Sequence, residues 1–213
     1  MSREAQRDSV MNLECRARFY KVLADCYHPP APSLWEALGS LLKCLPPKQR
    51  RLASHIQSML AARNGQAGLQ ALILDFSKLF VGPFSLLAPP YGSVYLDNEK
   101  RVMGESTAAA SEYYAQEGLG LAEHFQEAPD HIAVELEFLH FLYIKELQAV
   151  AQGDPEASLY YSAQRQAFLR EHLGRWVCSF AAAVRQEAGT SFYKHLASLT
   201  EMFLTEDMRI LSG

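Results

Sequence analysis

The sequence predicts an all-α protein, a single helical bundle of roughly nine to eleven helices with a Pro/Gly-rich hinge loop near the middle. Apolar residues recur every three or four positions along nearly the whole chain, which is the spacing of helix faces that pack on a core. Prolines and glycines separate these periodic stretches, as expected where helices end. Only residues 93–96, SVYL, have an extended character, and no second stretch of similar strength could pair with them, so we expect no sheet.

Four helices are predicted in the N-terminal helical part, residues 1–81. The first ends at Pro29–Pro30, because proline lacks a backbone donor and restricts the residue before it. The pattern S-L-W-E at residues 33–36 is a capping box that opens the second helix, and Pro46–Pro47 ends that helix. The third and fourth helices end at further breakers, Asn64–Gly65 and Gly82–Pro83.

Residues 82–107 are the one long irregular segment that the sequence predicts. They are rich in proline and glycine and carry aromatic residues, including Phe84 and Tyr91. A loop of this length in a compact domain is usually functional or a hinge. It divides residues 1–81 from a C-terminal helical part, residues 108–213. Aromatics beside prolines are typical of a packed crossover and of a peptide-binding groove, and the residues favour neither.

The central helix of the bundle is predicted within Glu127–Gly153. It is apolar over most of its circumference, which is typical of a helix surrounded by others. Asp130 is the expected N-cap and Gly153 the expected stop. A polar cluster of Glu127, Asp130 and His131 therefore lies at the mouth of this helix. Carboxylates also suit a helix N-terminus through its dipole, and spacing alone favours that structural interpretation over a recognition cluster.

The other C-terminal helices begin at recognisable caps. Thr107 is expected to cap the helix before the central one. Asp154–Pro155 begins a long helix, or two helices joined near Gly174, because proline suits the first turn after a cap. Thr190 is expected to cap the last helix.

Bulk composition indicates an ordinary soluble globular protein that needs no disulfides. Hydrophobic residues make up 49% and charged residues 21% of the 213 positions, and the net charge of −4 argues against nucleic-acid binding. The N-terminus lacks the apolar region of a signal peptide, and no apolar run is long enough for an integral membrane segment. We therefore expect a cytoplasmic protein. The four scattered cysteines are expected to be small buried side chains in a reducing compartment: Cys15, Cys26, Cys44 and Cys178.

No catalytic or metal-binding motif is complete. Glu137 and His140 form one Glu-x-x-His pair, whereas a di-iron bundle needs two such pairs and two more carboxylates. His140 is therefore expected to be a structural histidine, with no metal bound. Nucleophile elbows, phosphate-binding loops and dinucleotide fingerprints are absent, so the chain is not expected to be an enzyme.

Several motifs in order resemble the TorD/DmsD family of cytoplasmic chaperones dedicated to molybdenum-containing redox enzymes. The resemblance extends from about residue 70 to the C-terminus and is looser before that. It is carried by these stretches: FSKLFVGPFSLLAPPYGSVYLD at residues 76–97, GEST at 104–107, EAPDH at 127–131, FLREHLGRW at 168–176 and TSFYKHLASLT at 190–200.

The resemblance implies a chaperone for the apoenzyme of a molybdopterin-containing oxidoreductase. Such a chaperone binds the client's twin-arginine signal peptide and assists maturation and cofactor insertion before export by the Tat pathway. It also implies homodimers formed by domain exchange, with the hinge in residues 82–107. GTP binding is implied for some relatives, although the sequence has no phosphate loop. A helical adaptor in the assembly of a respiratory complex is the alternative.

Carried over by resemblance, the signal-peptide and client-binding positions are Phe76, Leu79, Phe80, Phe84, Pro90, Tyr91, Gly92, Ser93, Gly104, Glu127, Asp130 and His131. The carboxylates of Glu127 and Asp130 would bind the two guanidinium groups, and the aromatic residues would line a groove for the apolar segment. Two departures bear on this. An alanine separates Glu127 from Pro129. Relatives that serve DMSO reductase often carry tryptophan at the positions of Phe76, Phe84 and Tyr91, so the client of this chain is expected to differ.

Overall fold

The computed structural model describes residues 3–82, 86–97, 102–120 and 127–211. Within these ranges it contains ten α-helices and two π-helical turns, and no strand. The elements are α1 (Arg3–Cys26), α2 (Leu34–Cys44), α3 (Arg50–Ala61), α4 (Gly65–Phe76), η1 (Ser77–Val81), α5 (Gly92–Leu96), α6 (Glu105–Gln116), α7 (Ile132–Gln152), α8 (Pro155–Phe168), η2 (Leu169–Leu173), α9 (Gly174–Glu187) and α10 (Ser191–Leu211). The predicted all-α class and helix number are confirmed.

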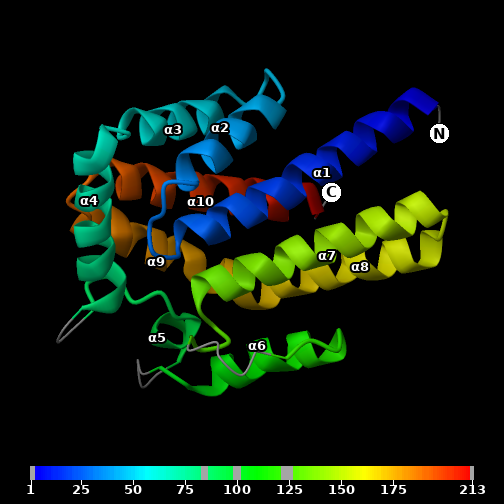
Figure 1. The fold of residues 1–213 in the computed structure, drawn as a ribbon. Helices are drawn as coiled ribbons and strands as arrows, with labels where there is room; N and C mark the ends of the chain where they lie inside the picture. Colours follow the sequence, from blue (N-terminus) through cyan, green and yellow to red (C-terminus); the bar gives the residue numbers. More distant parts are fainter. Residues whose placement is uncertain (1–2, 83–85, 98–101, 121–126, 212–213) are drawn as a thin grey trace.

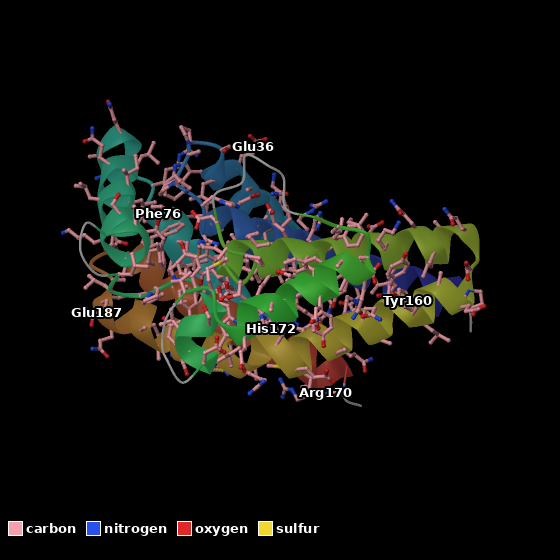
Figure 2. All side chains as sticks on the ribbon, turned by 90° about the horizontal axis from the view of Figure 1, so that it is seen from below. Glu36, Phe76, Tyr160, Arg170, His172 and Glu187 are labelled. Carbon is pink, nitrogen blue, oxygen red and sulfur yellow. The ribbon has the colours of Figure 1, made fainter. Side chains whose placement is uncertain are left out.

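The helices form one bundle in which the N-terminal and C-terminal parts of the chain interleave. α1 lies along α7, and α3 lies along α10, so each part covers the apolar face of the other. α7 and α8 run side by side as a long hairpin, and α4 stands across the opposite end of the bundle (Figure 1). Phe76 on α4 and Tyr160 on α8 mark these two ends in Figure 2.

α7 is the central helix, as its apolar circumference predicts. Its buried residues lie on most of its faces, and they include the carboxylates of Glu135 and Glu146. It ends at Gly153, which adopts the left-handed conformation that glycine allows, so the predicted stop is confirmed. Asp154 accepts a hydrogen bond from the backbone N–H of Ala157 and begins α8, which confirms that cap as well.

Other helix boundaries differ from the predictions. Ser33 has helical backbone angles and makes no side-chain capping bond, so the expected capping box is not formed. α6 begins at Glu105, which places Thr107 inside its first turn rather than at its cap. The SVYL stretch belongs to the short helix α5, so residues 82–107 are not irregular throughout the described part of that segment.

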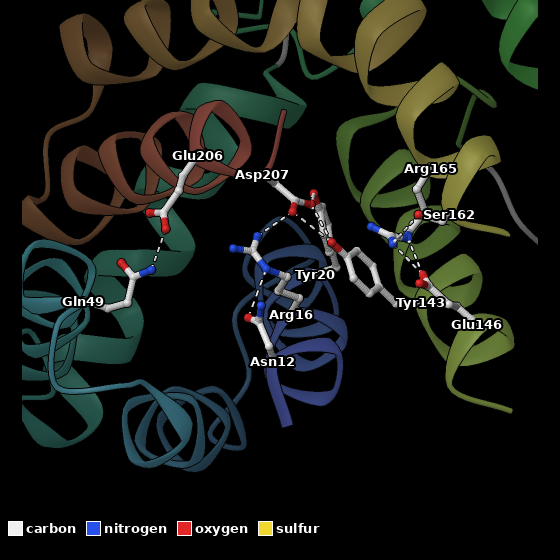
Figure 3. A network of polar contacts seen from close by, with 10 residues as sticks. All are labelled: Asn12, Arg16, Tyr20, Gln49, Tyr143, Glu146, Ser162, Arg165, Glu206 and Asp207. Atoms are coloured by element: carbon white, nitrogen blue, oxygen red, sulfur yellow. Dashed lines mark hydrogen bonds and ion pairs between the residues drawn. The ribbon is translucent and has the colours of Figure 1, made fainter. Parts of the chain in front are cut away.

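A buried polar network joins four helices (Figure 3). The carboxylate of Asp207 on α10 accepts hydrogen bonds from Tyr20 on α1 at 2.5 Å and from Tyr143 on α7 at 2.8 Å, and it pairs with Arg16. The guanidinium of Arg165 on α8 lies 3.8 Å from the centroid of the Tyr143 ring and pairs with a glutamate of α7. The network ties the first helix to the last.

Candidate functional site

The start of α7 is held against residues 90–92 by backbone hydrogen bonds. Tyr91 and His131 form an isolated antiparallel bridge. The N–H of Gly92 donates to the carbonyl oxygen of Asp130 at 2.9 Å, and the N–H of Ile132 donates to that of Pro90 at 2.8 Å. We call residues 90–93 together with residues 127–131 the hinge corner. It brings together seven of the residues that the resemblance implicates.

Asp130 is fully buried in the hinge corner and does not cap α7. Its Oδ2 accepts a hydrogen bond from the N–H of Ser93 at 2.7 Å, and its Oδ1 has no partner among the described residues. The N-cap is His131, whose Nδ1 accepts from the N–H of Ala133 at 3.1 Å. The predicted cap was one residue early, because the Asp130 carboxylate is taken up by the backbone at the start of α5. With no exposed surface, Asp130 does not offer its charge to a ligand in this conformation.

Tyr91, Glu127 and His131 form the outer part of the corner. The hydroxyl of Tyr91 donates to Oε2 of Glu127 at 2.7 Å, and its ring packs edge-on against His131 with 5.3 Å between centroids. Burial lowers the pKa of His131 to about 4, although neighbouring carboxylates oppose this, so the ring is neutral near pH 7 and free to accept at Nδ1. Glu127 is only half-buried and is therefore the carboxylate of the cluster that meets solvent.

A buried acid–histidine pair lies directly behind the corner. Glu135 is completely buried; Nε2 of His172 lies 2.8 Å from its Oε1, and Nε1 of Trp176 donates to its Oε2 at 3.2 Å. Burial raises the pKa of Glu135 to about 7. Burial alone would lower the pKa of His172, but the hydrogen bond and charge of Glu135 raise it overall. A side chain at Gly92 would press on Trp176 and Glu135, so the backbone approaches this pair closely.

The sequence alone does not predict that Glu135 meets His172 and Trp176. The sequence shows only that His172 and Trp176 lie one helical turn apart in the stretch FLREHLGRW, residues 168–176. The spacing within one helix cannot show which distant carboxylate faces it. His172 lies nearer the middle of the molecule than Phe76 in Figure 2.

Two of the aromatic positions carried over from the resemblance, Phe76 and Phe80, are core residues rather than the walls of an open groove. Phe76 is 8% and Phe80 5% exposed, and Leu79 is fully buried. Phe80 packs edge-on against Tyr27, Tyr193 and Phe76. The expectation that Phe76 and Phe80 present a surface groove is therefore corrected, since this face of α4 and η1 turns inward. Phe84 lies outside the described residues.

The outer side of the same elements exposes apolar side chains. Ile73 and Leu74 on α4 are 42% and 64% exposed, Val81 at the end of η1 is 59%, and Leu87 is 44%. We call these four residues the α4 apolar face. The helix is fixed behind them by Asp75, whose carboxylate accepts hydrogen bonds from the backbone of Gly189 and Thr190 and from the Thr190 hydroxyl.

Pro90, Gly92 and Gly104 of the predicted site shape the backbone rather than offering a side chain to a ligand. The carbonyl of Pro90 and the N–H of Gly92 make the hinge-corner bonds. Gly104 lies at the N-cap position of α6, and the Asp97 carboxylate occupies the space that a side chain there would need. That carboxylate accepts hydrogen bonds from the N–H and hydroxyl of Ser106. Gly104 therefore lets Asp97 reach the first turn of α6.

The Glu-x-x-His pair is structural, as predicted for His140. Nδ1 of His140 donates to the carbonyl of Ala17 on α1 at 2.8 Å, and Glu137 pairs with Lys21 and His28. In the part of the chain that the structure describes, no three histidine, cysteine, aspartate or glutamate side chains gather as a metal site would require. None of the helices in the described ranges has both the length and the apolar character needed to cross a membrane.

Comparison with known proteins places these features in a family. Residues 33–182 match the family model described as nitrate reductase delta subunit. The chain is 30% identical to the chaperone protein TorD of Psychrobacter sp., over 84% of this chain and 78% of that protein. It is 25% identical to the Tat proofreading chaperone DmsD of Salmonella typhimurium, over 84% of this chain and 79% of that protein.

The fold is also that of a solved structure. A crystal structure of a protein assigned to redox enzyme maturation, from Archaeoglobus fulgidus, superposes with a TM-score of 0.55 at 22% identity, over 89% of this chain and 93% of that one. The named relatives are chaperones rather than enzymes, in agreement with the expectation that the chain is not an enzyme. The chain belongs to the TorD/DmsD chaperone family, within the group that the nitrate reductase delta subunit model describes.

Proposed function

We propose that this protein is a cytoplasmic chaperone that binds the twin-arginine signal peptide and the apoenzyme of a molybdopterin-containing oxidoreductase. Binding would hold the client until its cofactor is inserted, and only then release it for export. Family membership supports a chaperone role. The exposed apolar side chains of the α4 apolar face, together with the half-buried carboxylate of Glu127, support the signal peptide as the ligand.

The two surfaces match the two parts of such a peptide. A twin-arginine signal carries two guanidinium groups followed by an apolar, helix-forming segment. Leu87 is separated from Tyr91 by four residue steps, which span at most about 14 Å, and Tyr91 is bonded to Glu127. An apolar helix on the α4 apolar face could therefore leave its arginines at Glu127. A carboxylate and a guanidinium make a charge-assisted hydrogen bond, and the apolar face would bury the rest.

Asp130 has a different part in this proposal from the one that the sequence suggested. Because it is buried and bonded to Ser93, it would hold the hinge corner in shape rather than contact the arginines. Glu127 would make the contact, despite the alanine that separates it from Pro129. The position of Glu127 depends on Tyr91, because the Glu127 carboxylate accepts a hydrogen bond from the Tyr91 hydroxyl.

Calorimetry with a twin-arginine peptide tests the charged part. Glu127→Gln should weaken binding about tenfold, because one charge-assisted hydrogen bond contributes about 1.5–3 kcal/mol. A peptide with both arginines replaced by lysine should bind the wild type more weakly and be less sensitive to the substitution. Glu156→Gln, at an exposed glutamate of α8, is the matched control and should leave the affinity unchanged. Equal affinity of Glu127→Gln and wild type would remove Glu127 from the site.

The apolar part has its own pair of variants. Leu74→Ser removes an exposed side chain of the α4 apolar face and should weaken the same peptide about tenfold, since burying a leucine contributes about 1.5–3 kcal/mol. Leu159→Ser removes the 72% exposed leucine of α8 and should have no effect. If both serine variants bind as the wild type does, the peptide lies elsewhere.

Co-purification separates the chaperone from the adaptor alternative. A chaperone should bring down a molybdoenzyme that lacks its cofactor and still carries its signal peptide, whereas an adaptor should bring down mature subunits. Domain-exchanged homodimers and GTP binding stay predictions from the resemblance, to be tested by light scattering and by titration with GTP.

A further inference from the structure

Two cysteines from different helices meet at the side of the bundle away from the hinge corner. Cys15 lies on α1, and Cys44 is the last residue of α2, 29 positions later. Their sulfur atoms are 2.9 Å apart. A disulfide bond is about 2.05 Å long, so the two atoms need to approach by less than about 1 Å. Both side chains are half-buried, which leaves the pair within reach of a small solute.

The surroundings give the two thiols different roles. The hydrogen bond between the two sulfur atoms, and after it the nearby charge of Arg18, lower the pKa of Cys44 to about 7 against the effect of burial. The same hydrogen bond and burial raise the pKa of Cys15. The Arg18 guanidinium also reaches Ser40 on α2 at 3.5 Å, so it lies over the same helix end. The lowered pKa makes Cys44 the more readily ionised of the two thiols, and therefore the better nucleophile, with Cys15 beside it.

The other two cysteines lack this arrangement. Cys26 is 1% exposed, and burial raises its pKa, so it stays a protonated core thiol. Cys178 is exposed, and burial and the neighbouring Glu201 raise its pKa. The expectation that all four cysteines are small buried side chains is therefore correct only for Cys26.

We propose that Cys15 and Cys44 are a reversible redox pair that a peroxide converts into an intrachain disulfide. The Cys44 thiolate attacks one oxygen of hydrogen peroxide, the O–O bond breaks, and Cys44 sulfenic acid and water form after proton transfer. The Cys15 sulfur then attacks the Cys44 sulfur, the S–O bond breaks, and a second water leaves with the Cys15 proton. The peroxide is reduced by two electrons and the two thiols are oxidised to one disulfide. A dithiol reductant reverses the reaction by thiol–disulfide exchange.

The crosslink would fasten the end of α2 to α1 and close a loop around the turn between them. Such a loop restricts the unfolded chain, so the oxidised protein should be the more stable form. The pair lies within residues 1–81, apart from the hinge corner and the α4 apolar face, so the inference does not depend on the proposed function. The crosslink would make the packing of α2 on α1 respond to oxidants.

Peroxide treatment followed by alkylation and peptide mapping tests the pair. Cys178→Ser is used as the background, because an exposed thiol forms crosslinks between molecules. The treated protein should lose two hydrogen atoms in mass, yield one crosslinked peptide joining Cys15 to Cys44, and regain both thiols with dithiothreitol. Its Tm should rise by on the order of 5 °C. Recovery of both cysteines in alkylated form, under conditions that oxidise Cys178 in the wild type, would overturn the proposal.

Two serine substitutions in that background sharpen the result. Cys15→Ser should form no crosslink, and its Cys44 should be trapped as a sulfenic acid by dimedone. Cys26→Ser should crosslink as the parent does. A crosslink that persists in Cys15→Ser, or that disappears in Cys26→Ser, would show that Cys44 pairs with a cysteine other than Cys15 and would contradict the proposal. Mapping of the parent protein remains decisive if either variant folds poorly.

Discussion

At the scale of single residues, burial gives the carboxylates around the start of α7 different roles. Glu127 is half-buried and accepts a hydrogen bond from the Tyr91 hydroxyl. Asp130 is fully buried and accepts from a backbone N–H, while Glu135 is fully buried against a histidine and a tryptophan. A buried carboxylate needs its partners to offset lost hydration, so these two acids hold the structure together. Glu127, the half-buried one, is the carboxylate to which the proposed function assigns the contact with the client's arginines.

Removal of the Asp130 carboxylate should destabilise the fold more than removal of an exposed cap. Asp130→Ala leaves the buried N–H of Ser93 without an acceptor, which should lower the free energy of unfolding by about 1–3 kcal/mol. Asp154→Ala removes an exposed N-cap of α8 and should cost about 1 kcal/mol or less. Urea denaturation measures both. Equal, small losses would mean that the hinge corner does not depend on Asp130.

Glu135 should make stability fall as the pH rises. Its ordinary pKa is 4.5 and its pKa in the folded protein about 7, so between these values the folded state holds a proton that the unfolded state has lost. This contribution is complete below pH 4.5 and lost as the pH passes 7. The raised pKa of His172 acts in the same direction, whereas the lowered pKa of His131 acts in the opposite one between about 4 and 6.5.

Glu135→Gln should therefore flatten the decline in stability between pH 5 and 8. The difference between variant and wild type should change over this window by on the order of 2–3 kcal/mol. Glu112→Gln, at an exposed glutamate of α6, is the control and should run parallel to the wild type. Parallel curves for Glu135→Gln would mean that this carboxylate titrates alike in the folded and unfolded chain.

Individual site residues were predictable only in part. The Asp-His pair at residues 130–131 was placed at the mouth of the central helix, and it is there. The sequence could not show that the aspartate turns toward Ser93, because that depends on a segment 37 positions earlier folding back. Aromatic character likewise does not distinguish Phe80, which faces the core, from a residue that faces solvent.

At the scale of elements, the two π-helical turns continue α-helices without a gap: η1 follows α4, and η2 follows α8. η2 joins α8 to α9 without a break, and Gly174 follows it immediately. The sequence left open whether one helix or two meet near Gly174, and the structure gives a continuous helix with one wide turn. Glycine is needed there because the carbonyl of Leu169 and the sulfur of Met208 occupy the space of a side chain.

Substitution of Gly174 should show this close packing. Gly174→Ala would push a methyl group into backbone and into α10, and should lower the free energy of unfolding by about 1–3 kcal/mol. Gly39→Ala, in the middle of α2, meets nothing within 4 Å and should instead stabilise by roughly 0.5–1 kcal/mol. Thermal denaturation of both variants measures the contrast. A stabilising Gly174→Ala would show that α9 can move aside.

At the scale of the whole molecule, the chain is closed by contacts between its first and last helices. Asp207 of α10 is the acceptor shared by Arg16 and Tyr20 of α1 and by Tyr143 of α7. Burial and the Asp207 charge raise the pKa of both tyrosines, so they remain donors. One side chain thus joins three helices.

Asp207→Ala should be the most destabilising of these substitutions. It leaves the buried guanidinium of Arg16 unpaired, and removal of one partner from a buried pair typically costs 3–5 kcal/mol. Glu201→Ala breaks a salt bridge to Arg185 in which both side chains are about a third exposed, and should cost about 1 kcal/mol or less. Urea denaturation of the two variants tests the difference, and similar losses would contradict a special role for Asp207.

The architecture was predictable from sequence to the level of helix number and class, but not to the level of helix partners. An apolar stripe shows that one face of α1 is buried and does not say that α7 covers it. The same holds for α3 and α10. These pairings join residues far apart in the chain, so they follow from the shapes of the complementary faces rather than from local spacing.

The join between residues 90–92 and residues 130–132 is made by main-chain atoms. Every residue except proline has both a main-chain N–H and a carbonyl, so the join does not depend on the side chains of Tyr91 and Glu127. Gly92 is the exception, because Trp176 and Glu135 lie where its side chain would be. Tyr91 or Glu127 can therefore be replaced while these bonds stay as they are, and under the proposed function such replacements would change which leader sequence binds. Binding preference could thus change by single substitutions at the surface of the hinge corner, while the main-chain join beneath it stays the same.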